Sequence, residues 1–171
     1  MREDAAHEAS QQVNMEEVER NAMRTLLKKH KLVKPDGHCL YRAIADQLTT
    51  YHDRVADHQL LRSQAAGYMR DHKDDFLPFL LNDAGDLMSD DEFSRYCDAL
   101  EKTAVWGGQP EILALAQVHE LPMHIFQMGA PVLTVAEEFQ SDSPICLSYH
   151  RYAFGLGQHY NSLRNQTTPE E

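Results

Sequence analysis

The spacing of apolar residues changes near Pro122, and this change constrains the fold more than any other feature of the chain. Before it, apolar side chains recur every three or four residues, as in Leu40, Ile44 and Leu48, a period typical of helices. After it, they alternate along short segments such as 145–149, a period typical of strands. Helices followed by strands predict an α+β domain with a mainly antiparallel sheet flanked by helices.

Turn residues and helix-start signals divide the chain into elements. Ser89 and Glu92 form a capping box, while Pro110 and Glu111 suit the first turn of a helix. Residues 74–91 predict a short helix or turn followed by an acidic loop. Five helices are expected. The first covers 14–30, the second begins close to Cys39, the third covers 57–73, and the last two follow Ser89 and Pro110. The expected strands are 123–126 and 132–135, paired as a hairpin, then 145–149 and, after a glycine turn, 158–163.

A length of 171 residues predicts one core. We expect an N-terminal helical segment over 1–31, a folded domain over 32–165 and a polar tail over 166–171. The sequence leaves open whether 1–31 belongs to a longer helical segment or packs on the domain. Without a long apolar run or a signal peptide, the chain is expected to be cytoplasmic and not to contact a membrane.

Acidic charge is concentrated in the domain. The chain has 16 basic and 27 acidic residues, and 1–31 holds six of each sign. Within the domain, 71–101 holds ten acids and two bases. Such a surface disfavours nucleic acid, whose binding needs clustered Lys and Arg, and suits a basic protein partner. A solvated face that serves solubility is the alternative interpretation.

The three cysteines carry no metal-binding or disulfide pattern. Cys39, Cys97 and Cys146 are odd in number and form no CxxC pair, so we expect reduced thiols without structural zinc. Cys97 is expected to be inert, because its segment pairs it with apolar neighbours at helical spacing.

Cys39 follows a tight turn and opens a helix. Backbone N–H groups and the helix dipole at such a place, with a His cation nearby, lower a thiol pKa from about 8.5 to roughly 3.5–7.5. Asp36, Gly37 and His38 share the turn, and its N–H groups are candidates for an oxyanion hole. The alternative is a buried, inert cysteine that packs in the core.

His159 and Asn161 lie two residues apart in the last expected strand, so their side chains project from one face. A nucleophilic Cys needs an imidazole to accept its proton, and the imidazole needs a partner for its other nitrogen. The alternatives are a surface histidine and a turn-forming asparagine. Together with Cys39, the pair predicts a Cys-His-Asn site.

Three runs in the sequence resemble the ovarian tumour (OTU) family of cysteine deubiquitinases, most of all its branch with a coiled helical segment before the domain. The runs are DGHCLYRAIADQL, WGGQPEILALA and HYNSL, beginning at Asp36, Trp106 and His159. The resemblance implies a papain-like fold, with Cys39 as nucleophile, His159 as general base and Asp36 as the acidic residue commonly counted as the third catalytic member. Asn161 matches the polar residue that orients the ring. We favour Asn161 as the direct partner and expect Asp36 to shape the loop.

The resemblance also implies a reaction and a partner. Cys39 would attack the carbonyl of the C-terminal glycine of ubiquitin or polyubiquitin, with the N–H groups of Cys39, Gly37 and His38 near the oxyanion and no metal or cofactor. Gly107 and Gly108 are expected to lie beside the substrate groove, and a helix entry is the alternative for this run; Trp106 is expected to pack in the core.

Rival functions remain open at this level. One is an OTU-like module that binds ubiquitin with little turnover, and another is a cysteine hydrolase for a different modifier or acyl substrate. The segment 14–30 can take a helical partner. Basic residues in its second half suggest RNA or ribosome binding, with a solvated helix face as the alternative. These residues are Arg20, Arg24, Lys28, Lys29 and Lys31.

Overall fold

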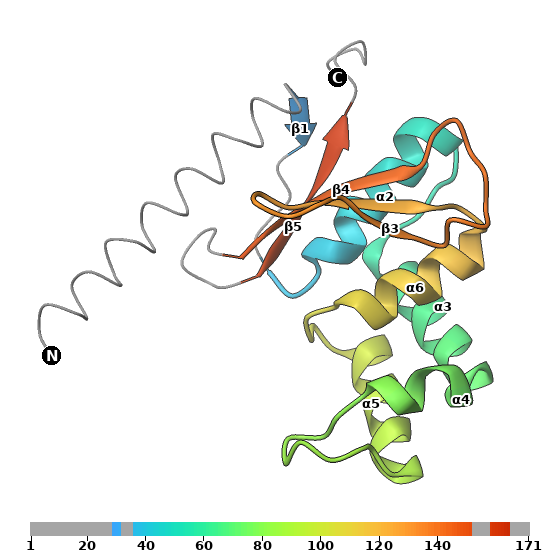
Figure 1. Ribbon diagram of the computed structural model, residues 1–171. Helices are drawn as coiled ribbons and strands as arrows, with labels where there is room; N and C mark the ends of the chain where they lie inside the picture. The colour runs from blue at the N-terminus through green and yellow to red at the C-terminus, as the bar shows by residue number, and fades with distance from the viewer. Residues whose placement is uncertain (1–28, 32–35, 152–157, 165–171) are drawn as a thin grey trace, which may run out of the picture.

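A computed structural model describes residues 29–31, 36–151 and 158–164, and these form helices packed beside one mixed sheet (Figure 1). The order of elements confirms the predicted α+β class, with helices before most of the strands. The helices are α2 (Cys39–His52), α3 (His58–Asp71), α4 (Lys73–Phe76), α5 (Asp90–Lys102) and α6 (Gln109–His119), with a 3-10 turn, η1 (Leu77–Phe79). The strands are β1 (Lys29–Lys31), β2 (Met123–Phe126), β3 (Leu133–Val135), β4 (Ile145–His150) and β5 (His159–Arg164).

The described strands form a five-stranded sheet in the order β1-β5-β4-β2-β3. The predicted hairpin is confirmed, with Met123 opposite Val135 in the antiparallel β2–β3 pair. The β4–β5 and β1–β5 pairs are also antiparallel, whereas β2 and β4 are parallel. Because β5 pairs with β4 and β1 on its two sides, the strand that begins at His159 is internal to the sheet.

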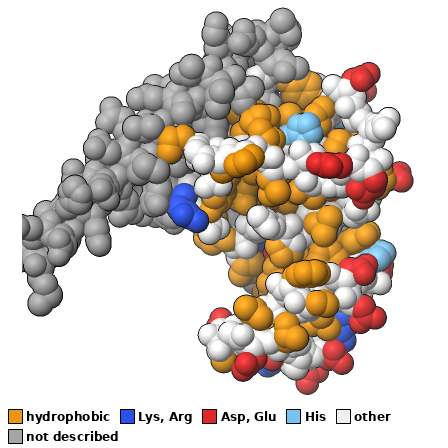
Figure 2. All heavy atoms as spheres, in the orientation of Figure 1, with side chains coloured by type: hydrophobic (Ala, Val, Ile, Leu, Met, Phe, Trp, Pro, Cys, Tyr) orange, Lys and Arg blue, Asp and Glu red, His pale blue; other side chains and the backbone are white. Residues whose placement is uncertain are grey.

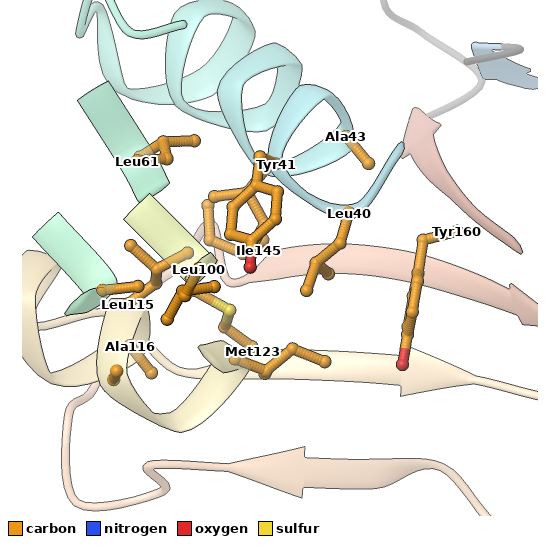
Figure 3. Packing of buried hydrophobic residues seen from close by; sticks show 14 of the residues in the cluster. Leu40, Tyr41, Ala43, Leu61, Leu100, Leu115, Ala116, Met123, Ile145 and Tyr160 are labelled. Atoms are coloured by element: carbon orange, nitrogen blue, oxygen red, sulfur yellow. The ribbon is translucent and has the colours of Figure 1, made fainter. Parts of the chain in front are cut away.

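Helix α2 packs against β4 and β5, and α3 packs against α2, α5 and α6. In Figure 1 the sheet fills the upper part of the view and α3 to α6 lie below it. Figure 3 shows Leu40 and Tyr41 extending from α2 into a cluster that includes Leu100 and Ile145. Cys39 itself belongs to this buried cluster, so the thiol lies at the edge of the hydrophobic core beside Leu40 and Tyr41.

The observed helix caps are those that the residue types predict. Ser89 accepts a hydrogen bond from the N–H of Glu92, and Glu92 accepts one from Ser89, so the predicted capping box is confirmed. Asp57 caps α3 through the N–H of Leu60. Helix α6 begins at Gln109, and Glu111 in its first turn accepts from the N–H of Gly108.

The predicted helix over 14–30 is wrong at its C-terminal end, the part that lies within the described residues. Lys29 and His30 were expected in the helix over 14–30, but Lys29–Lys31 forms β1 and pairs with β5 through its backbone. The sheet thus reaches beyond the expected domain start at residue 32. The rest of the 14–30 helix, the glycine turn and the 166–171 tail lie outside the described residues. No helix within the described ranges has the length and apolar character of a membrane span.

Candidate active site

Cys39 is the first residue of α2, and its side chain is buried. The backbone N–H groups of Leu40, in the same first turn, and of Tyr160, in β5, face its sulfur and favour the thiolate. Tyr160 directly follows His159. The packing of α2 on β5 therefore brings the thiol to the strand that carries the histidine, although the two residues are far apart in sequence.

His159 opens β5 and is buried with its ring held from the same strand. Its Nε2 lies 2.8 Å from the Oδ1 of Asn161, two residues further along the same face. An amide oxygen only accepts, so this contact places the proton of the neutral ring on Nε2. Nδ1 is then the ring nitrogen that can accept a proton from a thiol.

Asp36 is engaged within its own loop. Its Oδ1 accepts the backbone N–H of His38 at 2.9 Å, and its Oδ2 pairs with Arg42 one turn into α2. Burial opposes ionisation of Asp36, but these hydrogen bonds outweigh it and lower its pKa. Its effect on His159 is a weak electrostatic one that raises the pKa of the ring. This geometry fits a loop-shaping role for Asp36 and a ring-orienting role for Asn161.

The expected depression of the Cys39 pKa is wrong for this structure. Burial raises the pKa of the thiol, and the nearby backbone N–H groups of Tyr160 and Leu40 offset only part of that effect. Burial also lowers the pKa of His159, against the hydrogen bond that its ring donates to Asn161, which raises it. Both shifts favour the uncharged forms. Burial of the pair thus favours a neutral thiol and a neutral imidazole over an ion pair.

Two of the three loop amides expected to serve an oxyanion already have acceptors. The N–H of His38 donates to the Asp36 carboxylate, and the N–H of Cys39 donates to the Asp36 carbonyl at 3.1 Å. Gly37 is required by a close contact with another segment. A Cβ at Gly37 would lie 1.6 Å from the carbonyl oxygen of Ala104, so this loop touches the connection between α5 and α6.

The WGG run divides between core and surface. Gly107 is buried, and a Cβ there would lie 2.7 Å from both Leu40 and the Tyr41 hydroxyl. Gly108 has open space at its Cβ position and lines a cavity of ≈ 340 Å³ that also touches Tyr160. Trp106 is 43% exposed, so the expectation that it packs in the core is wrong. The buried Gly107 turns the chain and leaves its neighbour outside.

Two buried polar residues near the site were not found from the sequence. Arg62 on α3 is 2% exposed and hydrogen-bonds to the loop before Cys39. Glu111 on α6 accepts from the Tyr96 hydroxyl, and burial raises its pKa. The sequence held a signal for the burial of Arg62, because Arg62 directly follows Leu61, a member of the apolar stripe of the predicted 57–73 helix.

A surface of mixed character lies on the helical side of the domain. Phe79, Leu81 and Leu87 are exposed around η1 and the turn before α5, within the acidic stretch 71–101. Figure 2 shows apolar side chains gathered on the lower part of the molecule, with acidic side chains at its edge. This acidic and apolar surface is suited to a partner with basic and apolar groups.

Comparisons with known proteins agree on one family. The model for OTU-like cysteine proteases matches residues 34–160. The chain is 49% identical over 137 residues to "Deubiquitinase OTUD6B" of Gallus gallus, covering 78% of this chain and 44% of that protein. It therefore spans less than half the length of this relative.

Solved structures give the same fold. An OTUD1 OTU domain matches with a TM-score of 0.65 at 24% identity, covering 90% of this chain and 99% of that one. An OTU domain in complex with ubiquitin matches with a TM-score of 0.58 at 21% identity, covering 83% of this chain and 77% of that one. At these identities the likeness shows the fold, and the predicted papain-like OTU architecture is confirmed.

Proposed function

Because this chain belongs to the OTU family of cysteine proteases, we propose that it hydrolyses the isopeptide bond that follows the C-terminal glycine of ubiquitin. Cys39 is the nucleophile, His159 the general base and acid, and Asn161 the residue that orients the ring. Asp36 holds the loop before Cys39. The observation that carries the proposal is the packing of α2 on β5, which places the backbone N–H of Tyr160, next to His159, beside the Cys39 sulfur.

The reaction begins from the neutral pair. As the Cys39 sulfur attacks the glycine carbonyl, its proton passes to Nδ1 of His159, and the imidazolium is stabilised by the Asn161 oxygen at Nε2. The tetrahedral intermediate then collapses as His159 gives the proton to the departing lysine amine, leaving a thioester on Cys39. A water molecule, deprotonated by His159, hydrolyses the thioester and restores the thiol.

The oxyanion has to compete with Asp36 for its donors. The N–H groups of His38 and Cys39 are the loop donors beside the sulfur, and both donate to Asp36 in this structure. A charged oxygen is a stronger acceptor than a carbonyl, so the Cys39 amide is the one that transfers at least cost. Substrate binding is thus expected to loosen the contact between Cys39 and the Asp36 carbonyl.

Two features support ubiquitin as the substrate. The domain carries the excess of acid, which favours a partner with basic groups, and ubiquitin's C-terminal tail contains arginines before its two glycines. An OTU domain of the same fold has been solved in complex with ubiquitin. We propose that the cavity lined by Gly108 and Tyr160 accepts part of the tail next to the cleaved bond.

The test is cleavage of a ubiquitin C-terminal fluorogenic reporter and of a panel of di-ubiquitins of all linkages. We expect turnover by the unaltered chain, none by Cys39→Ala, and ubiquitin binding by both in calorimetry. Cys146→Ala is the matched control, since Cys146 is partly buried on β4 and should leave turnover unchanged. Cleavage by Cys39→Ala would disprove the proposed nucleophile.

A second candidate, a ubiquitin-binding module with little turnover, is favoured by the occupied amides of the loop and by the burial of Cys39 and His159, which disfavours their charged forms. These are features of an unactivated site. Tight ubiquitin binding together with a turnover no faster than that of Cys39→Ala would support this candidate over the enzyme.

A further inference from the structure

Arg62 on α3 is a buried cation whose hydrogen bonds converge on the loop before the nucleophile. Its Nε donates to Nδ1 of His38 at 3.0 Å, and one Nη donates to the carbonyl of Gly37 at 2.7 Å. The same nitrogen reaches the carbonyl of Val105 at 2.8 Å, and the other donates to Leu100 at 2.9 Å. Among the described residues, the hydrogen bonds of Arg62 go to uncharged acceptors and not to a carboxylate.

These acceptors belong to two separate segments of the chain. Gly37 and His38 form the turn that leads into Cys39, whereas Leu100 lies in the last turn of α5 and Val105 lies in the connection to α6. The planar guanidinium, with its fixed fork of donors, joins them at a set distance. The guanidinium also lies 4.3 Å from the centre of the Tyr41 ring, a second tie to the first turn of α2.

Stability alone is a weak explanation for this residue. Removing a charge from water is costly, and apolar side chains of similar volume commonly replace buried charged groups without loss of stability. Arg62 lies on a helix face shared with Leu61 and Ala65, where an apolar side chain would fit the pattern. What an apolar residue cannot do at this position is hold carbonyl groups of two segments in one orientation.

The contact with Gly37 sets the direction of the peptide group beside the nucleophile. A trans peptide points its carbonyl and N–H to opposite sides, so the bond from Arg62 to the Gly37 carbonyl directs the N–H of His38 towards Asp36. Glycine permits this peptide to rotate more freely than other residues do. A rotated peptide would place a carbonyl oxygen where the N–H now lies, one residue from Cys39.

We propose that Arg62 is a positioning residue for the catalytic cysteine: it locks the peptide between Gly37 and His38 and fixes that loop against the α5–α6 connection. The inference rests on the proposed function. Arg62 touches neither substrate nor sulfur and acts through the loop. It therefore affects alignment in the transition state more than the binding of ubiquitin, so its loss lowers kcat and leaves KM nearly unchanged.

The first test measures kcat and KM of Arg62→Ala with the ubiquitin reporter. A misalignment near 1 Å predicts a fall in kcat of about 100-fold, with KM within about threefold. The truncation leaves a space lined by the former acceptors, so millimolar guanidinium chloride should restore part of kcat, whereas ammonium chloride at equal concentration should not. A rise in KM at unchanged kcat, or no rescue by guanidinium, overturns the proposal.

Arg70 provides the matched control on the same helix. It joins α3 to α5 through Asp98 at 2.7 Å and Glu101 at 3.3 Å, but it lies on the surface away from the Cys39 loop. Arg70→Ala therefore removes a tie between the same two helices without releasing the loop. We expect its kcat to match that of the unaltered chain. An equal fall in kcat at Arg70 and Arg62 would mean that the helix contact matters and the loop contact does not.

A second measurement does not depend on ubiquitin and covers the case in which Arg62→Ala fails to fold. Arg62→Lys keeps the charge and most of the stem but cannot span the separated acceptors. In hydrogen–deuterium exchange we expect peptides over 36–40 and 103–108 to exchange faster in Arg62→Lys than in Arg70→Lys. Unchanged exchange overturns the positioning role. An inactive unaltered chain would reject the proposed function, and exchange would then decide the role of Arg62 separately.

Discussion

The two sides of the site are built by different means. On the cysteine side, Cys39 and its loop are held by contacts from distant segments, including Arg62 and the close approach of Gly37 to Ala104. On the histidine side, His159 is oriented by a residue two positions away on the same strand. One side depends on tertiary packing, and the other depends mainly on the period of a strand.

Because of this difference, substitutions on the two sides should affect stability and activity in different proportions. Changes in the cysteine loop disturb the interface between two parts of the fold, so they should lower both the free energy of unfolding and kcat. Changes on β5 remove a chemical group from a strand whose backbone pairing with β4 remains, so they should lower kcat far more than stability. The predictions below test this division.

The largest loss of turnover outside Cys39 is expected for His159→Ala. Without the imidazole the thiol has no acceptor for its proton, and kcat should fall by at least about 1,000-fold. Urea denaturation should show a loss of about 1–3 kcal/mol, as for other truncations of buried side chains. A turnover within tenfold of the unaltered chain would mean that another group accepts the proton.

Gly37→Ala is expected to affect both quantities. Its Cβ would overlap the Ala104 carbonyl oxygen at 1.6 Å, so the two segments must separate, at a cost of about 3 kcal/mol in the free energy of unfolding. The same separation should lower kcat by about 100-fold. Gly108→Ala is the control, because its Cβ meets no atom within 4 Å and stability should be unchanged. Equal stability of the two variants would remove the distinction between the two sides.

Sequence spacing is more informative about the histidine side than about the cysteine side, because the histidine side depends on neighbours within one strand. The spacing of His159 and Asn161 on one strand face is local information, and so are the capping box at Ser89 and the hairpin at 123–135. Residues 29–31 were expected in a helix but pair with β5, since strand pairing outweighs the helix propensity of a short segment. Their partner strand lies at the other end of the chain.

The contacts around Cys39 could not be predicted from spacing. The raised pKa of the thiol follows from how completely the fold buries it, and the exposure of Trp106 follows from the tight packing of Gly107 on Leu40. Both depend on which segments meet. The run from Asp36 to Cys39 indicated the proposed nucleophile, but the environment of Cys39 is set by α3 and by the α5–α6 connection.

Asn161→Ala and Asp36→Ala compare the two residues that the sequence left in competition. Loss of the Asn161 oxygen frees the ring, and kcat should fall on the order of 100-fold, less than at His159 because water can replace the acceptor. Asp36→Ala should cost kcat on the order of tenfold through the loop. Asn161→Asp keeps an acceptor and should retain more activity than Asn161→Ala. A larger loss at Asp36 than at Asn161 would reverse the roles proposed here.

The smallest expected effect is a pH dependence of stability carried by His159. Its folded pKa lies below the ordinary value of 6.5, because burial favours the neutral ring. Below pH 6.5 the unfolded chain gains a proton that the folded chain resists, so this contribution to stability is present above pH 6.5 and is lost as the pH falls. One proton limits the slope to about 1.4 kcal/mol per pH unit. Urea unfolding at pH 7.5 and at pH 5.5 should therefore show a smaller drop for His159→Ala than for the unaltered chain, with His124→Ala on β2 as the control. An equal drop in all three proteins would show that the buried ring on the histidine side carries none of the acid sensitivity of the fold.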